Sequence, residues 1–392
     1  MPLSMLHVLK LIFHSLIIFL SILFAVYLLT QAHARRRINA WLAGFLLCRA
    51  VVSLGGWLEH FIDLGTIVFR GAPWLFYVDG PFALLAMPFL FFYVLALTRD
   101  DFKLRLRHLV HGIPALVDII YLAVFLGTTP SEGLRNIIRA EESVPGTASL
   151  VLYIALQVQF FFYIAAAFAA VRSYRKRLKD LYAAMERINL SWLVLVLTGL
   201  TASKVFGLAD YAAWIGGRPG LSIGLYIVEQ VMFLAFISLM FLKALRQPTI
   251  FSGVPGKAAK TKYEKTLLAG PLREEYRDRL VRHMDEKKPY LNPLINLPDL
   301  AGQVRIPAHH LSQLLNACFR QNFFDFINAY RVRESQRLLV SEEAGTRTVL
   351  DILYETGFNS KSVFNTAFRK HVGMTPSEFK KAVESGARPR PD

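Results

Sequence analysis

Cysteine is almost absent from this 392-residue sequence, in which Cys48 and Cys318 are the two examples. Neither lies in a CxxC pair or has a histidine at ligand spacing, so neither a disulfide framework nor a zinc site is supported. Isolated free cysteines are commonly buried and inert. We therefore predict no metal site and no cofactor.

Catalytic motifs are also missing. The sequence contains no phosphate-binding loop, HExxH helix or nucleophile elbow, and no pair of carboxylates stands out as an acid and a base. We therefore expect the protein not to be an enzyme.

Charged residues make up only 19% of the chain, against 54% hydrophobic residues and a mean hydropathy of +0.37. The apolar residues gather in runs of about 20, the length that crosses a bilayer core as a helix. Seven such runs precede residue 246, and we predict seven membrane spans near Val8–Thr30, Asn39–Phe61, Trp74–Thr98, Leu109–Gly127, Ser149–Val171, Leu190–Ala209 and Leu221–Leu242.

The net charge is +16, and many of the basic residues lie in every second connection between these spans. Basic clusters follow the first, third and fifth spans, at Arg35–Arg37, Arg99–Arg107 and Arg172–Lys179. Because basic loops stay in the cytoplasm, the N-terminus is expected outside and the C-terminal domain inside, as in a bacterial inner membrane. Cleavage after Ala34 is the rival interpretation, but the apolar run is long and Arg35–Arg37 would resist export.

The composition changes after the last span. Residues 247–262 are rich in Pro, Gly, Ser and Lys and predict a flexible linker, whose lysines also suit anionic lipid headgroups. Residues 263–384 return to helical periodicity and predict a DNA-binding domain, and residues 385–392 predict a disordered tail.

The segment VLDILYETGFNSKSVFNTAFRKHVGMTPSEF, residues 349–379, has the pattern of a helix-turn-helix. Thr348 with Asp351 forms a capping box, Gly357 suits a left-handed helix end, and Ser360 caps the next helix. That helix should bury Phe364, Ala367 and Phe368. Its outward face would carry Lys361, Ser362, Asn365 and Arg369, side chains that suit phosphates and base edges.

Residues 296–320 match this unit in outline. Asn296 and Asp299 cap a helix to Val304, and a turn at Arg305–Pro307 leads into a helix with an apolar inner face. Its outward stripe is predicted at His309, Gln313, Asn316 and Arg320, with His310 beside it. Two such helices held about 34 Å apart would enter successive major grooves of double-stranded DNA. The alternative for each row of outward polar side chains is that it simply faces water and does not contact DNA.

The segments LSQLLNACFRQNFFDFINAYRVRESQRLL and GFNSKSVFNTAFRKHVGMTPSEF resemble the DNA-binding region of AraC/XylS-type transcription regulators, in a variant fused to a multi-span membrane domain. The resemblance implies that both recognition helices read DNA, through His309, His310, Gln313 and Asn316 and through Lys361, Ser362 and Asn365. The fold class is then all-α: a polytopic transmembrane helix bundle (residues 1–246) followed by a cytoplasmic AraC-type double helix-turn-helix domain.

Several ionisable residues fall within or beside the predicted spans, where they are costly and commonly face the bundle interior. One interpretation is a signal-sensing cavity reached by a small molecule from the outer side. The other is a set of structural ion pairs, such as Lys204 with Glu229 or Arg49 with Asp118. The residues concerned are Asp79, Lys204, Glu229, Arg49, Asp118, Glu59 and His60.

These features together predict a membrane-embedded one-component transcription regulator. Its partners would be double-stranded DNA, membrane lipid and a small ligand, and a homodimer is left open. The alternative is a transporter or anchor protein whose helix-turn-helix tail regulates it or binds another protein.

Overall fold

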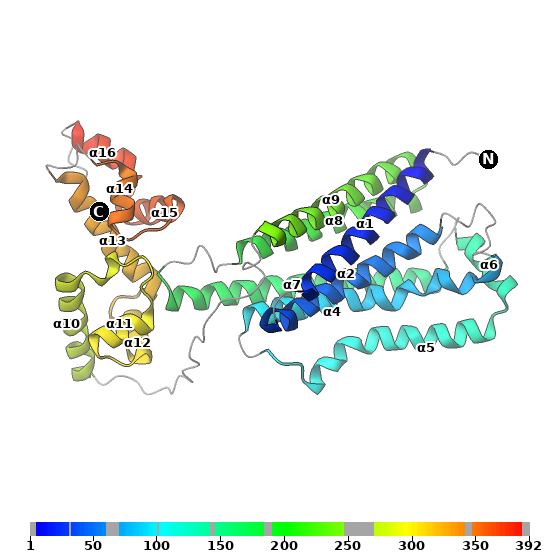
Figure 1. Cartoon of the computed structure of the whole chain (residues 1–392), viewed down its shortest axis with the longest axis horizontal. Coiled ribbons are helices and arrows are strands. Elements are labelled where there is room, and N and C mark those ends of the chain that lie inside the picture. The colour runs from blue at the N-terminus through cyan, green and yellow to red at the C-terminus, as the bar shows by residue number, and fades with distance from the viewer. Residues whose placement is uncertain are drawn as a thin grey trace. The chain divides into compact units, whose positions relative to one another are not determined.

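A computed structural model of the chain describes residues 5–30, 33–59, 70–99, 102–141, 146–183, 190–246, 270–341 and 347–385 (Figure 1). These residues form helices and their connections, and the extended pairing found among them is one isolated bridge between Tyr182 and Asn296. The all-α prediction is therefore confirmed. The predicted linker at 247–262 and, apart from Ser385, the predicted tail lie outside the described residues.

The chain divides into two compact units. The first contains residues 1–172 and 190–256, and the second contains residues 173–189 and 257–392. The second unit thus includes a segment that the sequence placed between the fifth and sixth membrane spans.

Seven helical segments of the described chain are long and apolar enough to cross a membrane, and each overlaps one predicted span. Two of them begin with a 3-10 turn, η1 (Pro73–Tyr77) before α4 (Asp79–Thr98) and η2 (Leu106–Gly112) before α5 (Ile113–Thr128). An amphipathic helix, α6 (Ser131–Glu141), follows α5. The long helices are α1 (Met5–Thr30), α2 (His33–Glu59), α4 (Asp79–Thr98), α5 (Ile113–Thr128), α7 (Thr147–Leu181), α8 (Ser191–Ile215) and α9 (Pro219–Arg246).

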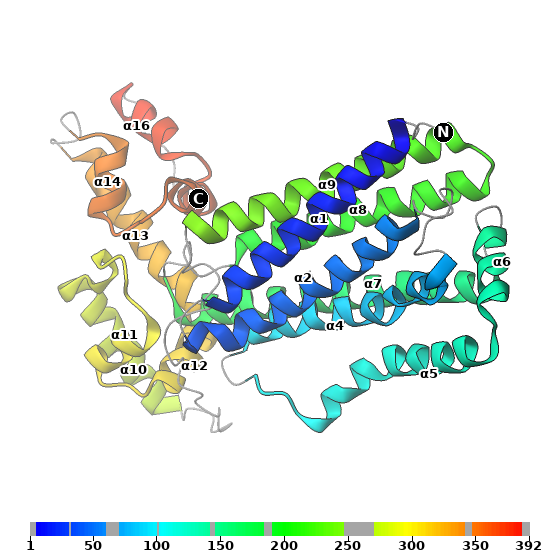
Figure 2. The same cartoon turned by 45° about the vertical axis from the view of Figure 1, so that its right-hand side comes forward.

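The long helices of the first unit pack in a continuous series, in which α5 lies against α4, α4 against α2, α2 against α1, α1 against α9 and α9 against α8 (Figure 2). Side chains of α7 contact α4 and α8 of this series. The amide nitrogen of Gln159 donates to the carbonyl oxygen of Leu84 on α4 at 2.9 Å. The ring of Tyr153 stacks on Tyr211 of α8 with 3.8 Å between centroids. Helices α2, α4, α7, α8 and α9 therefore come together around a common interior.

The outer faces of the first unit are apolar. Phe19, Val124 and Phe162 each expose more than half of their surface. Apolar surface on this scale is unfavourable in water, whereas hydrocarbon accepts it without cost. The pattern matches a helix bundle surrounded by lipid.

Helix α7 is longer than the sequence suggested. We expected a basic loop at Arg172–Lys179, but the helix continues through these residues and ends at Leu181. Arg and Lys are good helix formers, the segment contains neither Gly nor Pro, and basic side chains near a helix C-terminus interact favourably with the helix dipole. Likewise, α2 begins at His33, so Arg35–Arg37 belong to its first turns.

The second unit is built from seven α-helices and one short 3-10 turn among its described residues after residue 269. They are α10 (Gly270–Lys287), η4 (Pro289–Leu291), α11 (Leu297–Val304), α12 (Ala308–Cys318), α13 (Phe323–Val340), α14 (Val349–Glu355), α15 (Lys361–Val372) and α16 (Pro376–Glu384).

Two hydrophobic cores stabilise this unit, and α13 contributes to both. Its first half places Phe326 and Ile327 in a core with residues of α10, α11 and α12. Its second half places Val332 and Leu339 in a core with residues of α14, α15 and α16. A buried Ala183, just after the end of α7, belongs to the first core.

Candidate nucleic-acid interface and charged cavity

Helices α14 and α15 form the second helix-turn-helix with the predicted caps. The hydroxyl of Thr348 accepts the Asp351 amide N–H while the Asp351 carboxylate accepts the Thr348 N–H, a complete capping box. Gly357 has φ +84°, and the amide of Phe358 donates to the carbonyl of Leu353 at 3.0 Å. This bond closes the helix end and folds the buried Phe358 back onto the core.

Helices α11 and α12 repeat this turn with a different residue at its centre. Asn296 caps α11 by accepting the Asp299 amide at 2.9 Å, as predicted. Arg305 takes the left-handed conformation with φ 57°, and the Ile306 amide donates to the Ala301 carbonyl at 3.0 Å. Arg305 therefore occupies the place that Gly357 holds in the second helix-turn-helix. Its Cβ gives this conformation a steric cost that glycine does not have.

The outward face of α15 carries the predicted DNA-contacting residues. Lys361, Ser362 and Arg369 are exposed and Asn365 is partly exposed. On the opposite face Phe364 and Phe368 are fully buried. The helix therefore presents a cationic and amide-bearing surface on a rigid apolar support.

On α12, Asn316 is exposed and His309 and Gln313 are partly exposed, while Leu311 and Leu314 are buried. The side-chain amide nitrogen of Asn316 donates to the Ser312 carbonyl at 2.9 Å.

Two predicted members of the α12 face are placed differently from the rest. The predicted stripe extended to Arg320, but α12 ends at Cys318 and Arg320 follows with φ 54°. Arg320 is therefore exposed beyond the helix and not on its face. The ring of His310 lies 6.1 Å from that of Tyr276 on α10. Desolvation and the neighbouring His309 lower the pKa of His310.

Arg331, on α13, was missed by the sequence analysis because it lies among many other basic residues. It is 1% exposed, and its guanidinium donates to the carbonyl oxygens of Tyr290 at 2.8 Å and Asn292 at 2.9 Å. The same group lies 5.6 Å from the ring centre of Phe358. Arg331 thus touches both helix-turn-helix halves, a role that its neighbourhood in the sequence does not reveal.

Glycine at 357 completes this connection. A Cβ there would come within 2.7 Å of the carbonyl oxygens of Tyr290 and Leu291. The turn between α14 and α15 therefore packs directly on η4. Lys370 of α15 also pairs with Asp325 of α13 at 2.9 Å. These contacts fix α15 relative to α13, the helix shared by the two cores.

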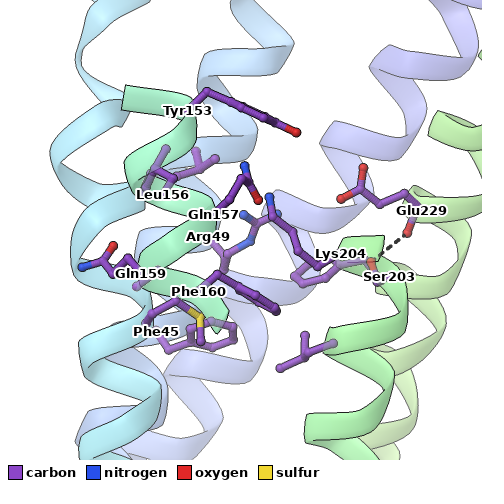
Figure 3. A pocket seen from close by; sticks show the side chains of 16 residues that line it. Phe45, Arg49, Tyr153, Leu156, Gln157, Gln159, Phe160, Ser203, Lys204 and Glu229 are labelled. Carbon is purple, nitrogen blue, oxygen red and sulfur yellow. Dashed lines mark hydrogen bonds between the residues drawn. The ribbon is translucent and has the colours of Figure 1, made fainter. Parts of the chain in front are cut away.

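The first unit contains a cavity of about 200 Å³ lined by α2, α4, α7, α8 and α9 (Figure 3). Its polar side chains include Arg49, Gln157, Lys204 and Glu229. Figure 3 shows the ends of Arg49, Gln157 and Lys204 directed toward one another, with the carboxylate of Glu229 on another side of the space. Three of the predicted sensing residues are therefore brought together.

The structural ion pairs considered from the sequence are not formed by these described residues. Lys204 and Glu229 interact electrostatically, but no nitrogen–oxygen pair between them is within 4.0 Å. Arg49 Nε and Asp118 Oδ2 are buried, and each is without a hydrogen-bond partner in the described part of the chain. The cavity thus holds charged groups that do not neutralise one another by direct contact.

The remaining sensing candidates lie elsewhere. Asp79 and Asp118 interact with each other and not with the cavity residues, and a Cβ at Gly80 would approach Asp118 Oδ2 to 2.7 Å. The side chain of Glu59 and all of His60 lie outside the described residues. The sequence therefore identified the charged groups but did not show that the cavity residues and the Asp79–Asp118 pair lie in different parts of the first unit.

Comparison with known proteins identifies the C-terminal part. A family described as a helix-turn-helix domain matches residues 300–382. The melibiose operon regulatory protein of Escherichia coli (strain K12) is 28% identical over 87 residues, or 22% of this chain and 28% of that protein. An uncharacterized HTH-type transcriptional regulator in the cgkA 5' region of Pseudoalteromonas carrageenovora is 25% identical over 91 residues, or 23% of this chain and 52% of that protein.

No solved structure gives a significant match to the chain. The alignments cover between 28% and 52% of the lengths of these two relatives. Residues 300–382 are a helix-turn-helix domain of the AraC type, preceded in this chain by seven long apolar helices.

Proposed function

We propose that the protein is a membrane-embedded one-component transcription regulator. Its first unit spans the membrane and binds a signal, and its second unit reads a DNA sequence through α12 and α15. The observation that carries this proposal is the presence, in one chain, of an AraC-type helix-turn-helix domain and seven apolar helices of membrane-spanning length. A small-molecule signal and its DNA response would then need no separate messenger protein.

The proposed readers are the side chains that leave the two recognition helices. Asn365 and Gln313 suit adenine edges, and Lys361 and Arg369 suit phosphate or guanine. The turns before α12 and α15 are closed by the Ile306–Ala301 and Phe358–Leu353 backbone hydrogen bonds, and Arg331 contacts both halves. Readers held on rigid elements in this way can keep a constant spacing along a duplex.

The orientation that we propose places the N-terminus outside and the second unit in the cytoplasm. It is supported by the basic residues after the first, third and fifth spans. It also puts the helix-turn-helix domain in the compartment that contains DNA.

The chain offers a covalent route between signal and reader. It passes between the two units after residues 172, 189 and 256, and the first passage lies within α7. The same helix carries Gln157 in the cavity lining and ends two residues before Ala183, which is buried in the core of the first helix-turn-helix. We propose that α7 transmits the change of state, because a helix without Pro or Gly moves as a rigid body.

The direct test is footprinting of the full chain, purified in lipid nanodiscs, on the DNA upstream of its own gene. We expect a protected site spanning two successive major-groove turns, with an affinity that falls steeply as the salt concentration rises. Glu286→Ala, which changes an exposed charge on α10, is a control that should retain the footprint. Protection that does not depend on the DNA sequence would contradict specific regulation.

A further inference from the structure

We infer that the cavity of the first unit binds a small organic anion with an apolar body, such as a monocarboxylate. This inference rests on the proposed sensing function and names the chemical class of its signal. It is carried by three properties of the cavity: its charge balance, its apolar wall and its size.

The charge balance favours an anion. Counted by their formal charges, Arg49 and Lys204 are cationic and Glu229 is anionic, so the lining has one excess formal positive charge. Arg49 and Lys204 also interact electrostatically with each other, as like charges. Between apolar walls such repulsion is screened far less than in water. A bound anion between the two groups would remove it and balance the net charge.

Unused hydrogen-bonding groups favour a ligand over an empty space. Arg49 Nε and Gln157 Oε1 are buried without a hydrogen-bond partner among the described residues. Gln157 is 9% exposed and lies on the cavity wall beside the two cations (Figure 3). Its amide can turn to present either its oxygen or its NH2 group, so it can donate to an anion. Buried polar groups in folded proteins nearly always have partners, and here a ligand would supply them.

The rest of the lining favours an apolar body. Phe45, Phe160 and Phe233 line the cavity, and the guanidinium carbon of Arg49 lies 4.7 Å from the ring centre of Phe233. The volume of about 200 Å³ is smaller than a typical drug-binding cavity. It selects a compact molecule, or the headgroup end of a longer one that reaches into the bilayer.

Gly207 makes room for the carboxylate of Glu229 against α8. A Cβ at Gly207 would lie 2.6 Å from Glu229 Oε1, so the absence of a side chain on α8 provides the space for this carboxylate. The carboxylate lies against the helix that also carries Lys204, but no nitrogen–oxygen pair between Lys204 and Glu229 is within 4.0 Å. An incoming anion then meets two cations that form no ion pair within 4.0 Å among the described residues.

The test is a binding measurement on the full chain in nanodiscs of zwitterionic lipid, without DNA. Three probes share one apolar body: phenylacetate, neutral phenylacetamide and cationic 2-phenylethylamine. We expect phenylacetate to bind most tightly, and Lys204→Gln to weaken it by at least about tenfold. Lys204→Arg should retain the binding, because it keeps the charge. Arg218→Gln, an exposed change in the turn between α8 and α9, should have no effect.

Glu229→Gln gives the sharper outcome, because it raises the net charge of the lining from one positive charge to two. It should tighten phenylacetate binding, whereas a purely structural Glu229 would give no gain. Tighter binding of the amine, or equal binding of all three probes, would overturn the proposal.

Oleate, added to the nanodiscs, distinguishes a lipid source from a soluble one. Binding of oleate without phenylacetate, lost in Lys204→Gln, would support the same anion site with a ligand from the bilayer. If neither anion binds in a charge-dependent way, the inference is wrong. A footprint obtained on the same protein without probes shows separately whether the DNA-binding function holds.

Discussion

Arg331 Nε donates a hydrogen bond to the carbonyl oxygen of Tyr290 at 2.8 Å, which joins α13 to η4 across 41 residues of sequence. A second bond from the same guanidinium reaches the Asn292 carbonyl at 2.9 Å. One side chain thus donates to two backbone carbonyls of the segment that precedes α11. The planar guanidinium is suited to two simultaneous bonds of this kind.

We therefore predict that Arg331→Met destabilises the second unit. The change keeps much of the apolar stem but removes both bonds, and the carbonyl of the buried Tyr290 loses its donor, at a cost on the order of 1–3 kcal/mol. Hydrogen–deuterium exchange of the full chain should show faster exchange in η4, α13 and α14. Arg282→Met, the same change at an exposed site on α10, should leave the rates unchanged. Unaltered exchange in Arg331→Met would show that the two bonds contribute little.

Arg305→Gly should stabilise the first helix-turn-helix by about 1 kcal/mol, because a left-handed conformation is unfavourable for a residue with a Cβ. Slower hydrogen exchange at α11 and α12 is the measurement. Arg282→Gly is the matched control and should destabilise α10, because glycine within a helix costs about 1 kcal/mol. If Arg305→Gly also loosens these helices, the arginine side chain stabilises the turn in a way that outweighs its backbone strain.

The turns show what local sequence can and cannot predict. Thr348, Asp351, Gly357 and Ser360 each carry a local preference, and the structure confirms the caps and the turn predicted from them. Arg305 has no such preference for a left-handed conformation. It adopts one because Ile306 must be buried and the chain must turn there, which is a tertiary requirement.

The cavity illustrates the same limit in three dimensions. Hydrophobic runs identified the seven spans and the charges inside them, because both signals are local. Whether Asp79 lies beside Glu229 or beside Asp118 depends on which helices are neighbours, and hydropathy does not contain that information. The end of α7 was missed for a related reason, since basic residues indicate a cytoplasmic position but do not end a helix.

Ala183 provides a test of the α7 extension. Because Ala183 is 1% exposed within the first core of the second unit, Ala183→Asp should bury a charge without a partner and destabilise that core. We expect faster hydrogen exchange in α10, α11 and α12, and weaker DNA binding. Ala317→Asp places the same charge at an exposed site of α12 and should leave exchange unchanged. If both variants exchange as the unaltered protein does, residues 173–183 do not contribute to this core.

The proposed topology predicts opposite results for two reporter positions. A fusion after Pro255 should be fluorescent with a cytoplasmic reporter and inactive with a periplasmic phosphatase, because basic residues follow the first, third and fifth spans. A fusion after Pro145, between the fourth and fifth spans, should show the reverse. The same result at both positions would mean that the number of spans between them is even, which contradicts seven crossings with the N-terminus outside.

Substitutions of Asn365 and Lys361 should affect DNA binding differently, although both side chains project from the same face of α15. If Asn365 pairs with an adenine edge, Asn365→Ala should cost about 1–3 kcal/mol at the preferred site and little at unrelated DNA. Lys361→Ala should weaken binding to all sequences and reduce the salt dependence by about one counterion, as expected for a phosphate contact. Lys381→Ala, an exposed change on α16, controls for net charge. An equal loss on every sequence from Asn365→Ala would assign that residue to the phosphate backbone and leave specificity to other side chains of α12 and α15.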